Sequence, residues 1–104
     1  MSTRLDKSLE RLFWDCDFER LELPEDEAFV IDRILERGDL PDITWARSSI
    51  GESKMRRRLG EQRGRGMDRM RLRFWQLIFD YPAAEVDAWL AHREAAPWER
   101  RRAQ

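Results

Sequence analysis

The sequence predicts an all-α fold, a compact single domain of five or six short helices with an irregular acidic-aromatic N-terminal arm. Apolar residues recur at spacings of three and four, capping residues and Gly or Pro break the chain at short intervals, and no stretch alternates apolar and polar residues over a strand length. The 104 residues include 5 Trp and 5 Phe, enough large apolar side chains for one core. We expect one helical domain over residues 1–96 and a frayed basic tail over 97–104.

The first helix is expected over residues 4–13. Leu5, Leu9 and Leu12 lie four and three residues apart, as on one face of an amphipathic helix, and a serine and a threonine precede them as candidate caps. The segment that follows, up to Leu23, crowds the aromatic residues Phe13, Trp14 and Phe18 among acids without a helical period. We interpret it as a loop or a short extended arm.

A longer helix is expected over residues 24–37. Pro24 suits the first position of a helix, the three acids after it suit the positive end of the helix dipole, and Gly38 is typical of the residue after a helix. The inward face is expected to carry Phe29, Val30, Ile31, Ile34 and Leu35.

Two shorter helices follow. Asp39 can cap a helix that ends before Gly51, and a basic helix is expected over 52–59. The expected buried residues of the two helices are Leu40, Ile43, Ala46, Ile50, Met55 and Leu59. Glycines then interrupt residues 60–66, which we expect to form the most mobile loop.

The last two helices are expected over residues 68–81 and 83–93, capped by Asp68 and separated by Pro82. The first carries two apolar stripes, which predicts burial on nearly all sides and makes it the central helix. The stripes are Met70, Phe74, Leu77, Ile78 and Tyr81 and, on another face, Leu72, Trp75 and Phe79. We expect Phe74, Leu77, Ile78 and Phe79 to be the best-buried residues, and Val86, Trp89 and Leu90 to pack from the last helix.

The charge reverses along the chain although the net charge is only −1. Residues 1–45 hold 6 Lys or Arg against 13 Asp or Glu, whereas residues 46–75 hold 10 against 3. Such poles steer association with a charged partner or with a second copy of the chain. A homodimer formed through opposite poles is therefore one expectation.

No catalytic or metal-binding constellation is recognisable, so we expect neither an enzyme nor a metal site or a cofactor. His92, the only histidine, lacks a set of ligands at metal-binding spacing, and Cys16 lies between two aspartates that disfavour its thiolate. We expect His92 on the surface and Cys16 buried or half-buried. A single cysteine, no signal-like opening and no apolar run of membrane length indicate a cytoplasmic protein without a membrane partner.

The densest signal is a run of arginines in the second half of the chain. They are Arg56, Arg57, Arg58, Arg63, Arg65 and Arg69, continued by Arg71 and Arg73. Arginines can contact phosphates and so supply sequence-independent affinity for nucleic acid. A solvated surface, or pairing with the acidic N-terminal half, explains them equally well. A helix-turn-helix around Gly51 fits poorly, because Arg47 and Arg57 occupy positions that are usually small and apolar.

Three blocks of sequence resemble a family of small uncharacterised prokaryotic proteins. The blocks are LFWDCD at 12–17, FVIDRILERGDL at 29–40 and FWQLIF at 74–79, and the resemblance covers residues 9–80. The family pattern is an LFWDxD-type opening with valine where this chain has Cys16, an apolar helix ending in ERG(D/T)L, and a closing FWxLIF helix. Its members are often encoded beside nucleotidyltransferase toxins of abortive-infection systems. The resemblance therefore implies an antitoxin-like protein whose partner is such a toxin.

Together, the resemblance and the charge pattern predict a non-enzymatic protein-binding module that neutralises a nucleotidyltransferase toxin. The expected partner-binding residues are Trp14, Asp15, Asp17, Phe18 and Glu19, with Glu22 and Glu25 adding negative charge. The two aromatic residues would act as apolar anchors, while the acids would meet a basic groove of the toxin. Core packing is the competing interpretation of Trp14 and Phe18. The alternative function is a nucleic-acid-binding module or operon repressor that uses the arginines between 56 and 69.

Overall fold

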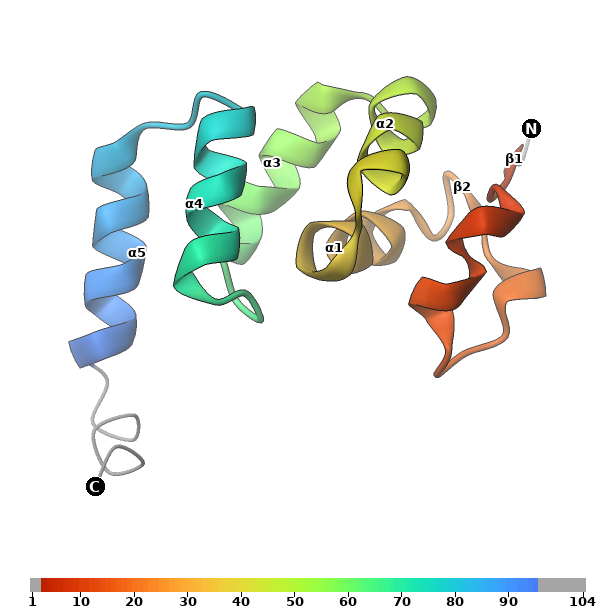
Figure 1. Cartoon of the computed structure of the whole chain (residues 1–104), viewed down its shortest axis with the longest axis horizontal. Helices are drawn as coiled ribbons and strands as arrows, with labels where there is room; N and C mark the ends of the chain where they lie inside the picture. The colour runs from red at the N-terminus through yellow and green to blue at the C-terminus, as the bar shows by residue number, and fades with distance from the viewer. Residues whose placement is uncertain (1–2, 96–104) are drawn as a thin grey trace. The chain divides into compact units, whose positions relative to one another are not determined.

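The computed structural model describes residues 3–95 and confirms the all-α class (Figure 1). These residues form five α-helices, two short 3-10 helices and one sheet of two very short strands. The structure falls into two compact units that divide between Glu61 and Gln62. The single domain expected over residues 1–96 stays a prediction, and the tail expected at 97–104 lies outside the described residues.

The N-terminal arm of the first unit is closed by a small antiparallel sheet. Its elements, in chain order, are β1 (Thr3–Arg4), η1 (Lys7–Phe13), η2 (Phe18–Arg20) and β2 (Glu22–Leu23). Thr3 lies opposite Leu23 in the register of the two strands. The acidic-aromatic segment therefore belongs to a loop whose two ends are paired as the strands β1 and β2.

The helix expected over residues 4–13 is the shorter 3-10 helix η1. Thr3 and Arg4 are paired in the sheet, so they cannot begin a helix, and Asp6 takes the capping position instead. Its carboxylate accepts a hydrogen bond from the Ser8 backbone N–H at 2.9 Å. The apolar face is as predicted, because Leu5, Leu9 and Leu12 are buried, and Phe13 is buried as well.

Helix α1 (Glu27–Arg37) begins three residues later than predicted. The Asp26 carboxylate accepts a hydrogen bond from the Glu22 backbone N–H at 3.0 Å, which closes a turn before the helix. Val30, Ile31, Ile34 and Leu35 are buried as predicted. Phe29 was expected to face inward, which is wrong, because its side chain is 39% exposed.

Gly38 ends α1 for a reason of space rather than of backbone conformation. Its φ is −70°, which any residue can adopt. A Cβ at this position would lie 2.8 Å from the Ile34 carbonyl oxygen and 2.9 Å from the Ile34 Cγ2. A side chain here would therefore force the end of α1 away from the chain that follows it.

Helices α2 (Leu40–Ser49) and α3 (Glu52–Gln62) follow, with Gly51 between them at a φ of +108°. Both η1 and α2 contact α1. The predicted residues Ile43, Ala46, Ile50, Met55 and Leu59 are buried. The prediction for Leu40 is wrong, because this first residue of α2 is 70% exposed.

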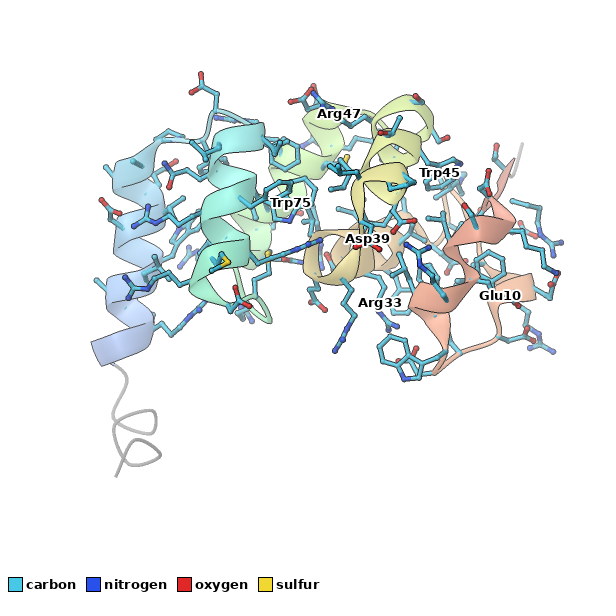
Figure 2. All side chains as sticks on the ribbon, in the orientation of Figure 1. Glu10, Arg33, Asp39, Trp45, Arg47 and Trp75 are labelled. Carbon is cyan, nitrogen blue, oxygen red and sulfur yellow. The ribbon has the colours of Figure 1, made fainter. Side chains whose placement is uncertain are left out.

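A buried carboxylate, Asp42, joins α2 to η1. It accepts a hydrogen bond from the Asp39 backbone N–H at 2.8 Å, one half of a capping box. Its Oδ1 atom also accepts from Arg11 Nη1 at 3.1 Å, and its Oδ2 atom accepts from Arg11 Nη2. Figure 2 labels Asp39 at the junction of α1 and α2. The carboxylate is thus satisfied although water barely reaches it.

The second unit is built on two neighbouring helices, α4 (Arg69–Ile78) and α5 (Ala83–Ala95), which lie side by side in Figure 1. Asp68 caps α4 as predicted, accepting a hydrogen bond from the Arg71 backbone N–H at 2.7 Å. The Arg93 side chain donates to the carbonyl oxygens of Gly64 and Met67 at 2.8 and 3.0 Å. These bonds hold the end of α5 beside the turn that leads into α4.

Only one of the two apolar stripes of α4 is buried. Leu72, Trp75 and Phe79 are buried, and the rings of Trp75 and Phe79 stack with their centroids 4.9 Å apart. The other stripe was expected to be buried as well, which is wrong for Leu77, exposed by 78%, and only partly right for the half-buried Phe74 and Ile78. Periodicity identifies an apolar face, but it does not show which face has a neighbour.

We expect Asp42→Ala to lower the free energy of unfolding by more than the ~1 kcal/mol that loss of a helix cap costs. The substitution removes the capping acceptor and leaves the Arg11 guanidinium without its buried partner. Asp42→Asn keeps an oxygen acceptor and should lose less. Denaturant unfolding of the two variants measures the difference. Equal losses would contradict this account of the Asp42 contacts.

We expect Trp75→Ala to destabilise the protein by about 3–5 kcal/mol, the usual cost of removing a large buried aromatic side chain. Phe74→Ala should cost clearly less, because Phe74 is only half-buried. The two adjacent aromatic residues of α4 therefore form a matched pair. Thermal melts followed by circular dichroism show which variant is the less stable. If Phe74→Ala were less stable than Trp75→Ala, the buried face of α4 would be the one that carries Phe74, contrary to this structure.

Candidate partner-binding surface

Arg33 joins α1 to the end of η1 in the first unit (Figure 2). Its Nη1 and Nη2 atoms donate to the two carboxylate oxygens of Asp15 at 2.8 and 3.0 Å. Nη1 also donates to the Leu12 carbonyl oxygen at 2.7 Å. Its side chain is only 11% exposed. A bidentate pair of this geometry fixes the orientation of the guanidinium group.

Aromatic rings surround this guanidinium group. Its carbon lies 5.4 Å from the centroid of the Phe13 ring and 5.0 Å from the centroids of Trp14 and Phe29. The guanidinium carbon of Arg37 lies 4.9 Å from the Trp14 ring. These distances are within the range of cation–π attraction. We call Trp14, Phe29, Arg33 and Arg37 the Trp14 surface.

Trp14 is the exposed aromatic residue of this surface that two guanidinium groups contact. It is 63% exposed, so the interpretation as core packing is wrong for this residue. Phe18 is half-buried, and its ring centroid lies 5.9 Å from that of buried Phe13. Of the two predicted apolar anchors, Trp14 is therefore available to a partner, while Phe18 supports the surface from within the arm.

The predicted acids are not gathered into one site. Asp15 pairs with Arg33, and Glu19 pairs with Arg4 at 3.0 Å. Asp17 pairs with Arg20 at 3.3 Å. Three carboxylates engaged by three different arginines do not point at a common cation. In the described part of the chain no group of three or more His, Cys, Asp or Glu could hold a metal ion.

The ion pairs also set the protonation of this region. The hydrogen bonds from Arg33 lower the pKa of Asp15. Lost hydration, followed by the charge of Asp15, raises the pKa of the Cys16 thiol, as its acidic neighbours predict.

Cys16 was expected to be buried or half-buried, which is wrong, because it is exposed. His92 lies exposed near the end of α5, as expected.

Part of the basic segment pairs with the acidic N-terminal half inside the first unit. Arg58 donates to both oxygens of Asp32 at 2.6 and 2.8 Å, and this pair raises the pKa of Arg58. Lys54 donates to Glu27 at 3.2 Å. For Arg58, pairing with the acidic half is thus the correct interpretation.

The other predicted nucleic-acid contacts are distributed over both units. Arg56 and Arg57 are exposed on α3, and Arg69 is exposed at the start of α4. Arg63 and Arg65 are exposed in the turn between these helices, where Arg63 has a φ of +56°. The structure therefore leaves five of the six arginines on the surface.

Sequence reasoning missed the α1 half of the Trp14 surface. Phe29, Arg33 and Arg37 follow one another at intervals of four residues, so they share one face of α1. This spacing was a usable signal. The assignment of Phe29 to the inward face of the helix concealed it.

No helix among the described residues has both the length and the apolar character needed to cross a membrane.

We expect the Asp15–Arg33 pair to stabilise the protein at neutral pH and not in acid. The pKa of Asp15 is lowered in the folded state, so its contribution is present above the ordinary Asp value of about 3.9 and is lost as the pH falls through the lower folded value. Wild type should melt above Asp15→Asn at pH 7, and the gap should close below about pH 4. Glu10→Gln is the control, because no ion pair joins Glu10 to another described residue. A gap that does not change with pH would contradict this role.

Residues 9–59 match the model of a family described as a family of unknown function (DUF6922). The matched range contains two of the three blocks noted in the sequence, at 12–17 and 29–40, and the block at 74–79 lies outside it. Searches of curated proteins and of solved structures found no match. The range includes Trp14, Phe29, Arg33 and Arg37, so the whole Trp14 surface lies in the part of the chain that is similar to this uncharacterised family.

Proposed function

We propose that this chain is a non-enzymatic protein-binding module and that the Trp14 surface is where its partner docks. One observation carries the proposal: Trp14 is 63% exposed and yet is held in place by two guanidinium groups. Exposing a large aromatic ring to water is unfavourable. Fixing that ring in one orientation is useful when another molecule covers it.

The composition of the surface supports a protein as the partner. Trp and Arg are the residues most enriched among those that dominate binding energy at protein interfaces. Trp14 and Arg37 are exposed at this place, and Phe29 adds apolar area at the edge. Because Arg33 is already fixed by Asp15, the surface loses little conformational freedom when a partner binds.

The acids contribute less than the sequence suggested. Asp15, Asp17 and Glu19 were expected to meet the basic groove of a toxin, but each is engaged by an arginine of its own chain. A paired carboxylate projects a weaker field than a free one. We therefore propose that Trp14 contributes most of the affinity for the partner. The acids would contribute mainly to the rate of association, and less than free carboxylates would.

The finer part of the proposal is an antitoxin-like role, with a nucleotidyltransferase-type toxin as the partner. It is supported by the resemblance of the blocks at 12–17, 29–40 and 74–79 to proteins encoded beside such toxins. Trp14 and Asp15 lie in the first block, while Phe29, Arg33 and Arg37 lie in the second. Residues of the proposed docking surface thus come from two of the blocks that carry the resemblance.

Nucleic-acid binding is the second candidate function. The observation in its favour is that Arg57, Arg63 and Arg65 are exposed and form no ion pair with another described residue. We rank it second because Arg58 is occupied by Asp32. Bases would also lack a stacking platform, because no aromatic residue lies among the arginines of 53–73.

We expect Trp14→Ala to weaken partner binding by at least about tenfold, the effect of removing an interface residue that contributes strongly. The protein is tagged, used to capture partners from its native cytoplasm, and compared with Trp14→Ala and Leu40→Ala. Leu40 is the matched control, since it is also a large exposed apolar residue of the first unit. A stoichiometric protein should be recovered with wild type and Leu40→Ala and lost with Trp14→Ala, and the captured protein should be a nucleotidyltransferase.

Two results would contradict the protein-binding proposal, and a third would contradict only the antitoxin role. Recovery of mainly nucleic acid would favour the second candidate. Equal recovery of the partner by Trp14→Ala and wild type would place the docking surface elsewhere. Capture of a partner that is not a nucleotidyltransferase would overturn the antitoxin role and leave the binding surface in place. Circular dichroism of both variants checks that they are folded.

A further inference from the structure

Helix α4 of the second unit carries a second apolar face that the fold leaves exposed. Met70 is 82% exposed, Leu77 is 78% exposed, and the half-buried Phe74 lies between them. We call these three residues the outer α4 face. The buried side of the same helix is formed by Leu72, Trp75 and Phe79. One helix of ten residues thus presents large apolar side chains on two faces.

The spacing of the outer α4 face is that of a helix-pairing seam. Phe74 follows Met70 by four residues, and Leu77 follows Phe74 by three. Alternation of four and three is the a/d pattern by which two helices pack side chains into each other. Single exposed apolar residues are common on protein surfaces, whereas a row of them along one helix marks an interaction site.

We propose that the outer α4 face pairs with the same face of a second copy of this chain, with the two α4 helices antiparallel. In this arrangement Phe74 faces Phe74 of the other copy at the two-fold axis, and Met70 faces Leu77. The three residues form a self-complementary seam because they are symmetric about Phe74 to within one residue. The inference does not depend on the function proposed for the Trp14 surface, which lies in the other unit.

The charges of α4 favour a second copy and the antiparallel direction. Arg69, Arg71 and Arg73 all lie in the first half of the helix, whose first turn holds no acid. The last turn holds no basic residue, and exposed Asp80 follows it. Antiparallel pairing brings Arg69 and Arg71 of each copy toward the C-terminal end of the other, where the helix dipole and Asp80 are negative. Arg73 lies one residue from the two-fold axis, and its side chain is held by Asp87 and Gln76 of its own chain. Parallel pairing would bring the arginines together.

This pairing differs from association through the opposite charge poles of the sequence. Pole-to-pole contact is electrostatic and weakens as salt screens it. Met70, Phe74 and Leu77 are apolar, so pairing through them should persist at high salt. The nearest charge to the centre is Arg71, whose guanidinium carbon lies 5.9 Å from the centroid of the Phe74 ring. Salt dependence of the dimer therefore separates the two modes.

Sedimentation equilibrium of the full chain over a wide concentration range tests the proposal. We expect a shift from one chain to two with rising concentration, retained at about 0.5 M salt, where exposed charges are largely screened. Leu77→Glu should raise the dimer dissociation constant at least tenfold, whereas Leu40→Glu, with an equally exposed leucine of the first unit, should leave it unchanged. Both substitutions are at exposed positions, and circular dichroism confirms that the variants are folded.

Disulfide trapping tests the direction of pairing. In a Cys16→Ser background, Phe74→Cys should cross-link to itself on mild oxidation, and Met70→Cys should cross-link to Leu77→Cys when the two variants are mixed. Two Cβ atoms must come within about 4.5 Å for this bond. A monomer at every concentration, a dimer that Leu77→Glu leaves intact, a dimer lost in salt, or Met70→Cys that cross-links mainly to itself would each overturn the proposal.

Discussion

The surface of the first unit depends on one guanidinium group. Arg33 brings together parts of the chain that are far apart in sequence: Asp15 and the Leu12 carbonyl at the end of η1, and Phe29 one turn earlier on α1. A lysine could carry the same charge, but it could not form the bidentate pair with Asp15 while a planar cationic group lies within 5.4 Å of three ring centroids. The exposure of Trp14 follows from this arrangement. Its ring is supported by Arg33 and Arg37 and does not need to enter the core.

Much of the fold could be predicted from local signals. Asp39, Asp68 and Gly51 mark helix boundaries because caps and breakers act within a few residues. The errors have non-local causes. β1 and β2 pair across 17 intervening residues, which no periodicity reports. Leu40 and Leu77 occupy apolar positions, yet their side chains are 70% and 78% exposed, and spacing alone does not reveal this.

The part of the candidate site that lies in the N-terminal arm could be predicted from the sequence, but the part on α1 could not. Trp14, Asp15 and Phe18 stand out in the sequence because aromatic residues are rare within acidic segments. Arg33 does not, since its importance arises from a contact made 18 residues away. The prediction of a cluster of free acids was wrong for the same reason, because contacts between residues far apart in sequence decide which acids are paired. The arginines that engage Asp15, Asp17 and Glu19 come from different elements, and a count of charges along the chain does not assign partners.

The charge reversal of the sequence has a different meaning once the first unit is folded. Glu27 pairs with Lys54 and Asp32 with Arg58, so members of the acidic and basic blocks meet at contact distance across 26 or 27 residues. Each such pair neutralises one charge of each block at short range, so the folded first unit is less polar than the sequence suggests. The full polarity belongs to the unfolded chain. There the two blocks attract each other over long distances, which contracts the ensemble and draws the α1 and α3 segments together before any side chain is buried.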